Sequence, residues 1–470
     1  ERLVTDSRRV VPGAVFFAVP GLNTDGNLYI DEAIHRGASA IISEAEYAPT
    51  YGNIAHIQVP DVRLAMAVVA ARFYDHPEAA LNITGITGTN GKTTVASLSQ
   101  YLLEEKQADV GLLGTIQYDL GQRTLPAYKT TPESVDIYGM LHQMRESGCT
   151  KCVMEVSSHA IDQQRVQGLK IDTAVFLNLT QDHMDYHGSM ENYFECKKRL
   201  FNGETGVDVP TVVINLDDPY GGIILDQIHT DRPVITYGLS DWATIRAENL
   251  KLEQGGSSFE VVWPQGRVPM QTHLPGEYNI SNILAALSIA YANGYEIGDL
   301  TQKIKNYPGV PGRMEPVDAG QPFQILVDYA HTDDALRNAL NMLRPITPGR
   351  LIVVFGCGGN RDRKKRPMMM KAVLESADIV WATSDNPRKE PIEQIFEDMR
   401  EGLEENRHSV EFEPDRRRAI GLALDTAKEG DCVLIAGKGH EKFQEFESTV
   451  IPFDDRQVAI DWINMKTFVS

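Results

Sequence analysis

The sequence has 470 residues, of which 42% are hydrophobic, and this length exceeds what one hydrophobic core usually organises. Its 45 basic and 65 acidic residues give a net charge of −20, which disfavours binding to nucleic acid phosphates. No uncharged apolar run reaches the roughly 18 residues of a membrane helix, so neither nucleic acid nor a membrane is an expected partner.

Five cysteines, an odd count, are typical of a reducing cytosol rather than of a disulfide framework, so we expect a cytoplasmic protein. Cys149 and Cys152 have CxxC spacing, but no second pair completes a zinc site. Packing as reduced thiols is therefore favoured over metal or redox use. The chain shows no signal peptide and opens at Glu1, which is compatible with removal of a short leader.

Apolar β-rich runs alternate with helical patterns along the chain, which predicts an α/β fold with parallel sheets. Breaks near residues 76–82 and 306–316 divide it into three predicted domains, at 1–82, 83–311 and 312–470. Each buried strand is followed by a polar or Gly-rich loop, and active loops lie at the carboxyl ends of strands in parallel sheets. The candidate strands lie at 172–179, 210–216, 350–356, 378–384 and 431–437.

The first strong motif is LNITGITGTNGKTTVASLSQYLL (81–103), where an apolar strand runs into glycines and then into a helical pattern. Gly88 and Gly91 allow backbone N–H groups to point at an anion. Lys92 would supply charge to terminal phosphates, and Thr93 would offer a hydroxyl to Mg²⁺. The first glycine of the strict Walker A pattern is missing, but the strand–loop–helix context favours nucleotide binding over a simple Gly-rich turn.

Two other short motifs point elsewhere and are weaker. GCGGNR (356–361) follows a predicted strand, but its sixth position is Arg361 rather than Gly, so NAD binding is not expected. SSH (157–159) suggests a Ser-His hydrolase, yet the chain has no GxSxG elbow.

Polar residues also follow predicted strands in the middle of the chain. Glu155 ends one apolar run, and NLTQDHMDYHG (178–188) follows another. His183 and His187 have i, i+4 spacing and would face one zinc ion if their segment were helical. A magnesium–nucleotide site is the competing interpretation, because Mg²⁺ prefers oxygen ligands, and exposed loop side chains are a third.

A series of motifs in this order resembles the Mur ligase family over almost the whole chain. The segment DSRRVVPGAVFFAVPG (6–21) is similar to the amino-terminal signature of the branch that adds the third peptide residue to UDP-N-acetylmuramoyl-L-alanyl-D-glutamate. The other motifs are GTNGKTT (88–94), EVSSHA (155–160), NLTQDHMDYHG (178–188), GEYNISNILAA (276–286), PGRME (311–315), DYAHTDDAL (328–336) and DNPR (385–388).

The resemblance implies an ATP-dependent, ADP-forming amide ligase of cytoplasmic peptidoglycan synthesis that acts as a monomer. Its domains would be an amino-terminal UDP-binding α/β domain, a central P-loop-type ATPase domain and a carboxyl-terminal Rossmann-like domain, with domain closure completing the site. A substrate carboxylate would attack the γ-phosphate of ATP, and an amine would then displace phosphate from the acyl phosphate. Such catalysis depends on charge neutralisation and positioning.

The resemblance also assigns the catalytic and nucleotide residues. Lys92 is similar to the γ-phosphate lysine, and Glu155 and His183 to metal ligands that act with Thr93. Asn282, at a helix start, would contact adenine. The predicted ATP-binding residues are Gly88, Thr89, Asn90, Gly91, Lys92, Thr93, Thr94, Asn282, Arg313, Asp328 and His331, and the cofactors are ATP and Mg²⁺.

Lys197, in YFECKKRLF (193–201), aligns with a lysine that the family carbamylates. A carbamate converts the cation into an anion that can hold Mg²⁺, whereas a solvated or salt-bridged lysine is the alternative. For the UDP-linked substrate, the guanidinium of Arg165 suits a phosphate or carboxylate best, and Thr130 is equally explained as an ordinary loop hydroxyl. The implied UDP-substrate residues are Ser7, Thr130, Thr131, Ser157 and Arg165.

SDNPRKEP (384–391) resembles the segment that selects the amino acid. Enzymes for meso-diaminopimelate typically show DNPR, because Arg388 can pair with the extra carboxylate that lysine lacks. Lys364 and Lys365, in the basic run 361–366, are equally explained as surface charge. The implied diaminopimelate residues are Arg361, Asp385, Asn386, Pro387, Arg388, Gly437 and Glu441.

Several rival functions share part of this pattern. A ligase that adds L-lysine differs only at the selecting segment, and DNPR disfavours it. A folylpolyglutamate synthetase shares the phosphate loop but not the amino-terminal signature. A non-catalytic nucleotide-gated protein would not need Lys92, Glu155 and Asp328 together, and a kinase would leave a stable phosphorylated product.

Overall fold

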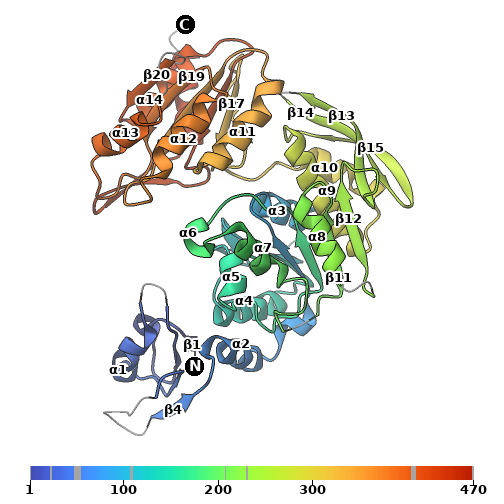
Figure 1. The fold of residues 1–470 in the computed structure, drawn as a ribbon, viewed down its shortest axis with the longest axis vertical. Helices are drawn as coiled ribbons and strands as arrows, with labels where there is room; N and C mark the ends of the chain where they lie inside the picture. Colours follow the sequence, from blue (N-terminus) through green and yellow to red (C-terminus); the bar gives the residue numbers. More distant parts are fainter. Residues whose placement is uncertain are drawn as a thin grey trace. The chain divides into compact units, whose positions relative to one another are not determined.

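The computed structural model describes residues 2–21, 24–46, 54–105, 109–206, 208–228, 231–253, 255–403 and 409–467. Its fold is mixed α/β with mainly parallel sheets, as the alternating sequence pattern predicts (Figure 1). The chain forms two compact units, of which the first comprises Glu1–Arg246 and Leu284–Asp299 and the second Ala247–Ile283 and Leu300–Ser470. The division into three domains, with cuts at 82 and 311, stays a prediction.

The amino-terminal sheet alternates its side chains between two faces. Phe16 and Ile41 pack with Ile30 of α1, whereas Phe17 and Ile42 belong to the cluster that contains Met66 of α2. Successive strand residues point to opposite faces, so one helix covers each side. The parallel strands, in spatial order, are β1 (Leu3–Val4), β2 (Val15–Ala18), β3 (Ala40–Ser43) and β4 (Ala55–Gln58), and the helices are α1 (Ile30–His35) and α2 (Val62–Phe73).

The central sheet has 11 strands in the order β15-β14-β13-β12-β11-β10-β5-β9-β6-β7-β8. Its strands are β5 (Asn82–Thr87), β6 (Val110–Leu113), β7 (Gln117–Asp119), β8 (Thr124–Pro126), β9 (Lys151–Glu155), β10 (Thr173–Phe176), β11 (Thr211–Asn215), β12 (Val234–Gly238), β13 (Ile245–Glu253), β14 (Gly256–Trp263) and β15 (Gly266–Thr272). Its helices are α3 (Lys92–Leu103), α4 (Ser134–Glu146), α5 (Ser158–Asp162), α6 (Met184–His187), α7 (Met190–Lys198), α8 (Pro219–Gln227), α9 (Glu277–Ala292) and α10 (Thr301–Asn306).

The parallel strands at the centre of this sheet end at one edge. Ile86 pairs with Glu155 of β9, and Thr87 pairs with Phe176 of β10. The segments that follow these strands therefore start close together, as expected for an active edge of a parallel sheet. Strand β10 is shorter than predicted, because the chain turns away after Phe176 to bring Asn178 to the phosphate loop.

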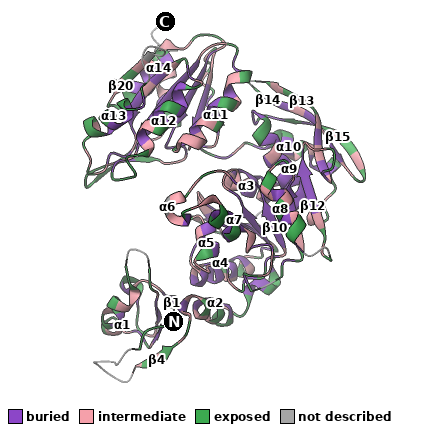
Figure 2. Ribbon diagram, in the orientation of Figure 1, coloured by how far each residue is buried: buried purple, intermediate pink, exposed green. Residues whose placement is uncertain are grey.

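The carboxyl-terminal sheet has the order β16-β17-β21-β18-β19-β20 and is parallel except at β16. Val353 and Phe355 of β18 pack with α11, α12 and α13, whereas Ile352 and Val354 pack with α14 and α15. Helices thus cover both faces, and the central strands β18 (Leu351–Cys357) and β21 (Cys432–Ala436) are buried (Figure 2). The elements are β16 (Glu315–Pro316), β17 (Gln324–Asp328), α11 (Asp333–Ile346), β18 (Leu351–Cys357), α12 (Lys365–Leu374), β19 (Ile379–Ser384), α13 (Ile392–Arg400), β20 (Ser409–Glu413), α14 (Arg416–Thr426), β21 (Cys432–Ala436) and α15 (Asp455–Thr467).

Smaller elements complete the fold. Strands β22 (Phe443–Phe446) and β23 (Thr449–Pro452) form an antiparallel hairpin. Short 3-10 helices lie at Ser7–Arg9, Gly26–Tyr29, Pro77–Ala80 and Ile297–Leu300. All five cysteines are buried and free, as expected for reduced packing thiols. In the described part of the chain, no helix has both the length and the apolar character needed to cross a membrane.

Candidate active site

The phosphate loop connects β5 to α3 as the motif predicts. Gly91 adopts a left-handed conformation, with φ 85°, directly before the first residue of α3, where a side chain would be strained. The side chain of Asn178 fixes the loop, because its Oδ1 accepts the N–H groups of Thr89 at 3.1 Å and Asn90 at 2.8 Å. The sequence analysis missed Asn178, although its place directly after a buried strand was a usable signal.

Two lysines share one acceptor in this loop. Lys92 Nζ donates to Gly88 O at 2.9 Å and to Thr89 O at 2.8 Å, and Lys197 Nζ donates to Gly88 O at 3.0 Å. Lys197 is 1% exposed and lies 4.6 Å from the centre of the Tyr193 ring. Burial and the nearby Lys92 ammonium hold the pKa of Lys197 well below its usual value. Lys197 is therefore buried, and it forms no ion pair with a carboxylate of the described residues.

Glu155 lies at the centre of an oxygen-rich cluster. It accepts hydrogen bonds from Thr93 Oγ1 at 3.1 Å, Thr115 Oγ1 at 3.0 Å and the Thr115 N–H at 2.8 Å, and it is 1% exposed. Thr130 Oγ1 lies 3.1 Å from Thr115 Oγ1, so Thr130 belongs to the same cluster. Carboxylate and hydroxyl oxygens are the ligands that Mg²⁺ prefers, so Thr93 and Glu155 fit that ion. Sequence reasoning missed Thr115.

The two histidines proposed for zinc both pack against the rings of His159 and Tyr193. His183 precedes α6 with φ 55°, and its ring lies 4.7 Å from that of His159. His187 Nε2 lies 2.9 Å from Ser158 Oγ, and its ring stacks on Tyr193. The zinc interpretation required both histidines to lie in one helix. It is wrong in this premise, because His183 precedes α6 in a left-handed conformation. No cluster of three or more His, Cys, Asp or Glu side chains suited to a metal occurs among the described residues.

Three of the predicted UDP-substrate residues meet at the start of α5. Thr131 Oγ1 donates to Glu155 O at 2.8 Å and accepts the Ser157 N–H at 3.1 Å. Arg165 donates to Thr131 O at 2.8 Å, and its Nε lies 3.1 Å from Glu133. Ser7 makes a different contact: its hydroxyl donates to Glu32 at 2.7 Å.

Glu133 balances the positive charge of this region. Lys129 lies 2.7 Å from its carboxylate, Arg165 3.1 Å and Arg63 3.5 Å. Burial opposes the charged form, but these cations together hold the pKa of Glu133 below its usual value. The Glu133 carboxylate thus orients Arg165 and partly neutralises the positive charge of its guanidinium group.

The nucleotide residues predicted for the second unit are tied to one another. Asp328 accepts the N–H groups of Met314 and Ala330, each at 2.8 Å, and burial raises its pKa although Arg313 opposes this. Arg313 lies over the Tyr329 ring at 4.7 Å, and His331 Nδ1 lies 2.8 Å from Tyr329 O.

Asn282 also belongs to the second unit but differs in place from the prediction. It lies in the second turn of α9 rather than at its start, is 7% exposed and donates to Asn279 Oδ1 at 3.2 Å. The helix begins earlier because Glu277 and Tyr278 already have helical conformation after Gly276, which is left-handed with φ 85°.

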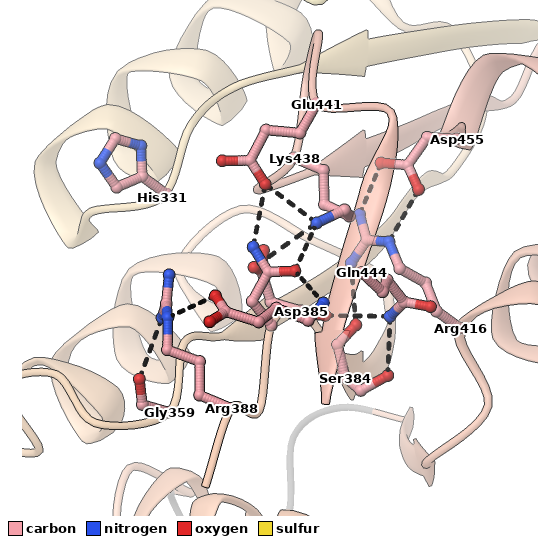
Figure 3. Close-up of polar contacts among 12 residues, drawn as sticks. His331, Gly359, Ser384, Asp385, Arg388, Arg416, Lys438, Glu441, Gln444 and Asp455 are labelled. Atoms are coloured by element: carbon pink, nitrogen blue, oxygen red, sulfur yellow. Dashed lines mark hydrogen bonds and ion pairs between the residues drawn. The ribbon is translucent and has the colours of Figure 1, made fainter. Parts of the chain in front are cut away.

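Arg388 and Arg361, predicted to bind diaminopimelate, flank the same glycine. A Cβ on Gly358 would lie 3.3 Å from Arg388 Nη1 and 3.5 Å from Arg361 Cγ. Arg388 Nη1 donates to Gly359 O at 3.0 Å, and Arg388 Nε lies 2.9 Å from Glu445 (Figure 3). Two segments more than twenty residues apart thus bring the Arg388 guanidinium and the aliphatic stem of Arg361 to the same glycine.

The loops after β19 and β21 bring the other predicted residues together. Asn386 Nδ2 donates to Glu441 Oε2 at 3.0 Å, and a Cβ on Gly437 would lie 2.8 Å from Asp385 Oδ2. Lys438 contacts both loops and was missed by sequence reasoning, although it lies inside the motif GKGHE. Pro387 lies between Asn386 and Arg388 in the same loop.

Two arginines of the basic run 361–366 form ion pairs with carboxylates of the same unit. Arg363 pairs with Asp398 at 2.7 Å, and Arg366, 1% exposed, pairs with Glu390 and Asp398 at 2.7 Å each. These ion pairs hold the pKa values of Glu390 and Asp398 at about 2. The charges of Arg363 and Arg366 are therefore balanced by internal carboxylates, and ligand binding by Arg361 stays a prediction.

Three family models match successive parts of this chain. The Mur ligase family catalytic domain matches residues 2–74, the Mur ligase middle domain matches residues 86–290, and the Mur ligase glutamate ligase domain matches residues 312–439. The matched ranges contain the phosphate loop, the Glu155 cluster and the DNPR segment described above.

Relatives with a common printed name match nearly the whole chain. The UDP-N-acetylmuramoyl-L-alanyl-D-glutamate–2,6-diaminopimelate ligase of Geobacillus thermodenitrificans is 43% identical over 461 residues, covering 97% of this chain and 93% of the relative. Its namesake from Solibacter usitatus is 44% identical over 457 residues, covering 97% and 92%. A solved structure of a ligase with that name is 35% identical, with a TM-score of 0.71 and coverage of 99% and 95%. The chain therefore belongs to the Mur ligase family.

Proposed function

We propose that this chain uses ATP to join meso-diaminopimelate to the D-glutamate of UDP-N-acetylmuramoyl-L-alanyl-D-glutamate. The observation that carries the proposal is the Arg388 guanidinium beside Gly358, in the same unit as Glu441 and Asn386. Diaminopimelate is lysine with one more carboxylate, and a guanidinium group suits that carboxylate. Bound lysine would instead place an ammonium opposite Arg388.

The reaction forms an acyl phosphate and then an amide. The D-glutamate carboxylate attacks the γ-phosphorus of ATP and ADP leaves. The amine of diaminopimelate then attacks the acyl carbon, loses a proton, and phosphate departs. Lys92 and the N–H groups of the phosphate loop neutralise the phosphate charge, while Arg165 and Thr131 hold the UDP-linked substrate.

Mg²⁺ is proposed at Thr93 and Glu155, whose oxygens lie within hydrogen-bonding distance of one another. The bound ion would supply positive charge to the phosphate oxygens. His183 is proposed as a further ligand on the resemblance. Lys197 is proposed to be carbamylated: its low pKa favours the neutral amine, which adds to CO₂ and releases a proton to give a carbamate.

The proposed setting of the reaction is the cytoplasm, with the chain acting as a monomer. The five free, buried cysteines support a reducing compartment. Sedimentation of the purified chain with its substrates tests whether the chain is a monomer.

A single assay tests the function. Purified protein is mixed with ATP, Mg²⁺, the UDP-muramoyl dipeptide and either diaminopimelate or L-lysine, and ADP, phosphate and the new amide are measured. We expect amide formation with diaminopimelate, with ADP, phosphate and amide in equal amounts. Amide formation with lysine only, or a stable phosphorylated product, would overturn the proposal.

A further inference from the structure

A buried cation lies between the two loops that the proposed function uses. Lys438 is 0% exposed, and its Nζ donates to Asn386 Oδ1 at 2.9 Å and to Glu441 Oε2 at 3.0 Å (Figure 3). Asp385 lies 3.9 Å from the same nitrogen, and the Phe443 ring centre lies 5.5 Å away. Lys438 is therefore enclosed by residues that are themselves candidates for binding diaminopimelate.

The contacts of Lys438 fix the amide of Asn386 in one orientation. Asn386 Oδ1 accepts from Lys438 Nζ and from the Glu445 N–H at 3.1 Å, and Asn386 Nδ2 donates to Glu441. A rotated amide would place its NH₂ group against the ammonium and the N–H group, which are both donors. Glu441 Oε2 is consequently held by two donors, Asn386 and Lys438.

The charges of this cluster suit one more cation. Asp385 and Glu441 carry two negative charges around the single positive charge of Lys438, so the cluster has one negative charge left for a ligand ammonium. Without Lys438 the two carboxylates would lie close together without a cation between them, and repulsion would displace them.

The strand ends behind the cluster are held rigidly. Arg416 donates to Ser384 O at 3.3 Å and to Ala436 O at 3.0 Å, and it pairs with Asp455 through two bonds of 2.7 Å. Arg416 and Asp455 are both 0% exposed. Ser384 ends β19 and Ala436 ends β21, so Arg416 holds together the starts of the two loops that Lys438 connects. Figure 3 shows Arg416 bound to Asp455, near Ser384.

We propose that Lys438 is a positioning residue that holds Asn386 and Glu441 in the geometry that binds an ammonium group of diaminopimelate. This inference rests on the proposed function and adds a residue to it. Lys438 acts through its two neighbours. Its loss therefore weakens binding of the amino acid and leaves ATP binding unchanged.

The test compares Lys438→Met, which keeps the length and removes the charge, with Lys442→Met as control. Lys442→Met is the same substitution four residues further along the chain, and Lys442 is exposed. We expect Lys438→Met to raise the KM for diaminopimelate about ten- to hundredfold, the cost of losing hydrogen bonds to charged groups. The KM for ATP should stay within twofold, and Lys442→Met should match the wild type.

A double-variant comparison covers the case in which Lys438→Met does not fold. Glu441→Gln/Lys438→Met leaves no unpaired carboxylate at position 441 and is compared with Glu441→Gln alone. Because Asn386 also loses its orientation, the added change should raise the KM for diaminopimelate again, by a smaller factor than in the wild type.

Two results separate the inference from the proposed function. An unchanged KM for diaminopimelate in folded Lys438→Met, or in the double variant relative to Glu441→Gln, would overturn the role of Lys438 while the wild-type enzyme still forms the amide. Absence of amide formation by the wild type would overturn the proposed function itself.

Discussion

At the scale of single residues, Gly88 O organises the phosphate loop by accepting from both Lys92 and Lys197. Two ammonium groups so close repel each other, and burial adds to the cost of charging Lys197. A neutral amine relieves both effects and is also the form that reacts with CO₂. The environment of Lys197 therefore favours the modification that the resemblance implies.

Replacing Lys197 tests this chemistry. We expect Lys197→Ala to lose at least about a hundredfold in kcat, since the proposed carbamate would no longer hold charge beside the phosphates. Added acetate or formate should restore part of the activity by occupying the space of the carbamate. Lys198→Ala is the control, because Lys198 pairs with Glu195 on the same helix. Full activity of Lys197→Ala, or no rescue at any concentration, would contradict the assignment.

Replacing Arg388 tests the choice of amino acid. Loss of a paired guanidinium from a partly buried site costs about 2–3 kcal/mol, so Arg388→Ala should raise the KM for diaminopimelate roughly thirty- to hundredfold. The KM for ATP should not change, and discrimination against lysine should fall. Arg337→Ala serves as control, because Arg337 forms an exposed pair with Glu375. Unchanged kinetics with diaminopimelate would show that another residue binds the additional carboxylate of diaminopimelate.

At the scale of elements, ion pairs connect helices to the loops they follow. Arg366 of α12 binds Glu390, which precedes α13, and Asp398 within α13. Arg416 begins α14 and Asp455 begins α15, and their pair joins these helix starts to the ends of β19 and β21. Polar side chains at element ends thus position the loops, while apolar faces bury the helices.

The Arg366 pair predicts a pH-dependent stability. Its hydrogen bonds hold the pKa of Glu390 at about 2, below the usual 4.5, so the stabilisation is full above about pH 4.5 and is lost as pH falls towards 2. We expect Glu390→Gln to lower the free energy of unfolding by about 2 kcal/mol at pH 7. Urea unfolding at pH 7, 5, 4 and 3 should show this difference shrinking below pH 4.5. A difference independent of pH would contradict the ion pair as its source.

At the scale of the whole molecule, the proposed amino-acid site is built from segments far apart in the chain. Residues 358–361, 385–388 and 437–445 meet because β18, β19 and β21 are parallel neighbours within one sheet.

Hydrogen exchange tests this assembly. With a non-hydrolysable ATP analogue and the UDP-linked substrate present, diaminopimelate should slow exchange by about tenfold or more in peptides that cover all three segments. A peptide covering β2 and β3 in the first unit should not change and serves as the internal control. Protection limited to one of the three segments would contradict a shared site.

The sequence by itself determined the class of fold and the main chemistry. Alternation of apolar runs and helical patterns predicted the parallel α/β fold, because burial of strand faces requires that pattern. The buried runs at 350–356, 378–384 and 431–437 match β18, β19 and β21 within one residue or so at each end. GTNGKTT indicated the phosphate loop and DNPR indicated the loop proposed to bind the amino acid, since each motif is a short run of consecutive residues.

Only the tertiary structure decided which polar groups meet. Asn178, Thr115 and Lys438 gain their roles from partners more than twenty residues away along the chain, and no local spacing encodes such contacts. The same reason explains why the sequence did not indicate that Arg363 and Arg366 pair with Asp398. The sequence gives the chemistry of each side chain. Which partner that side chain contacts depends on the tertiary fold, which brings the ends of strands together at one edge of a sheet.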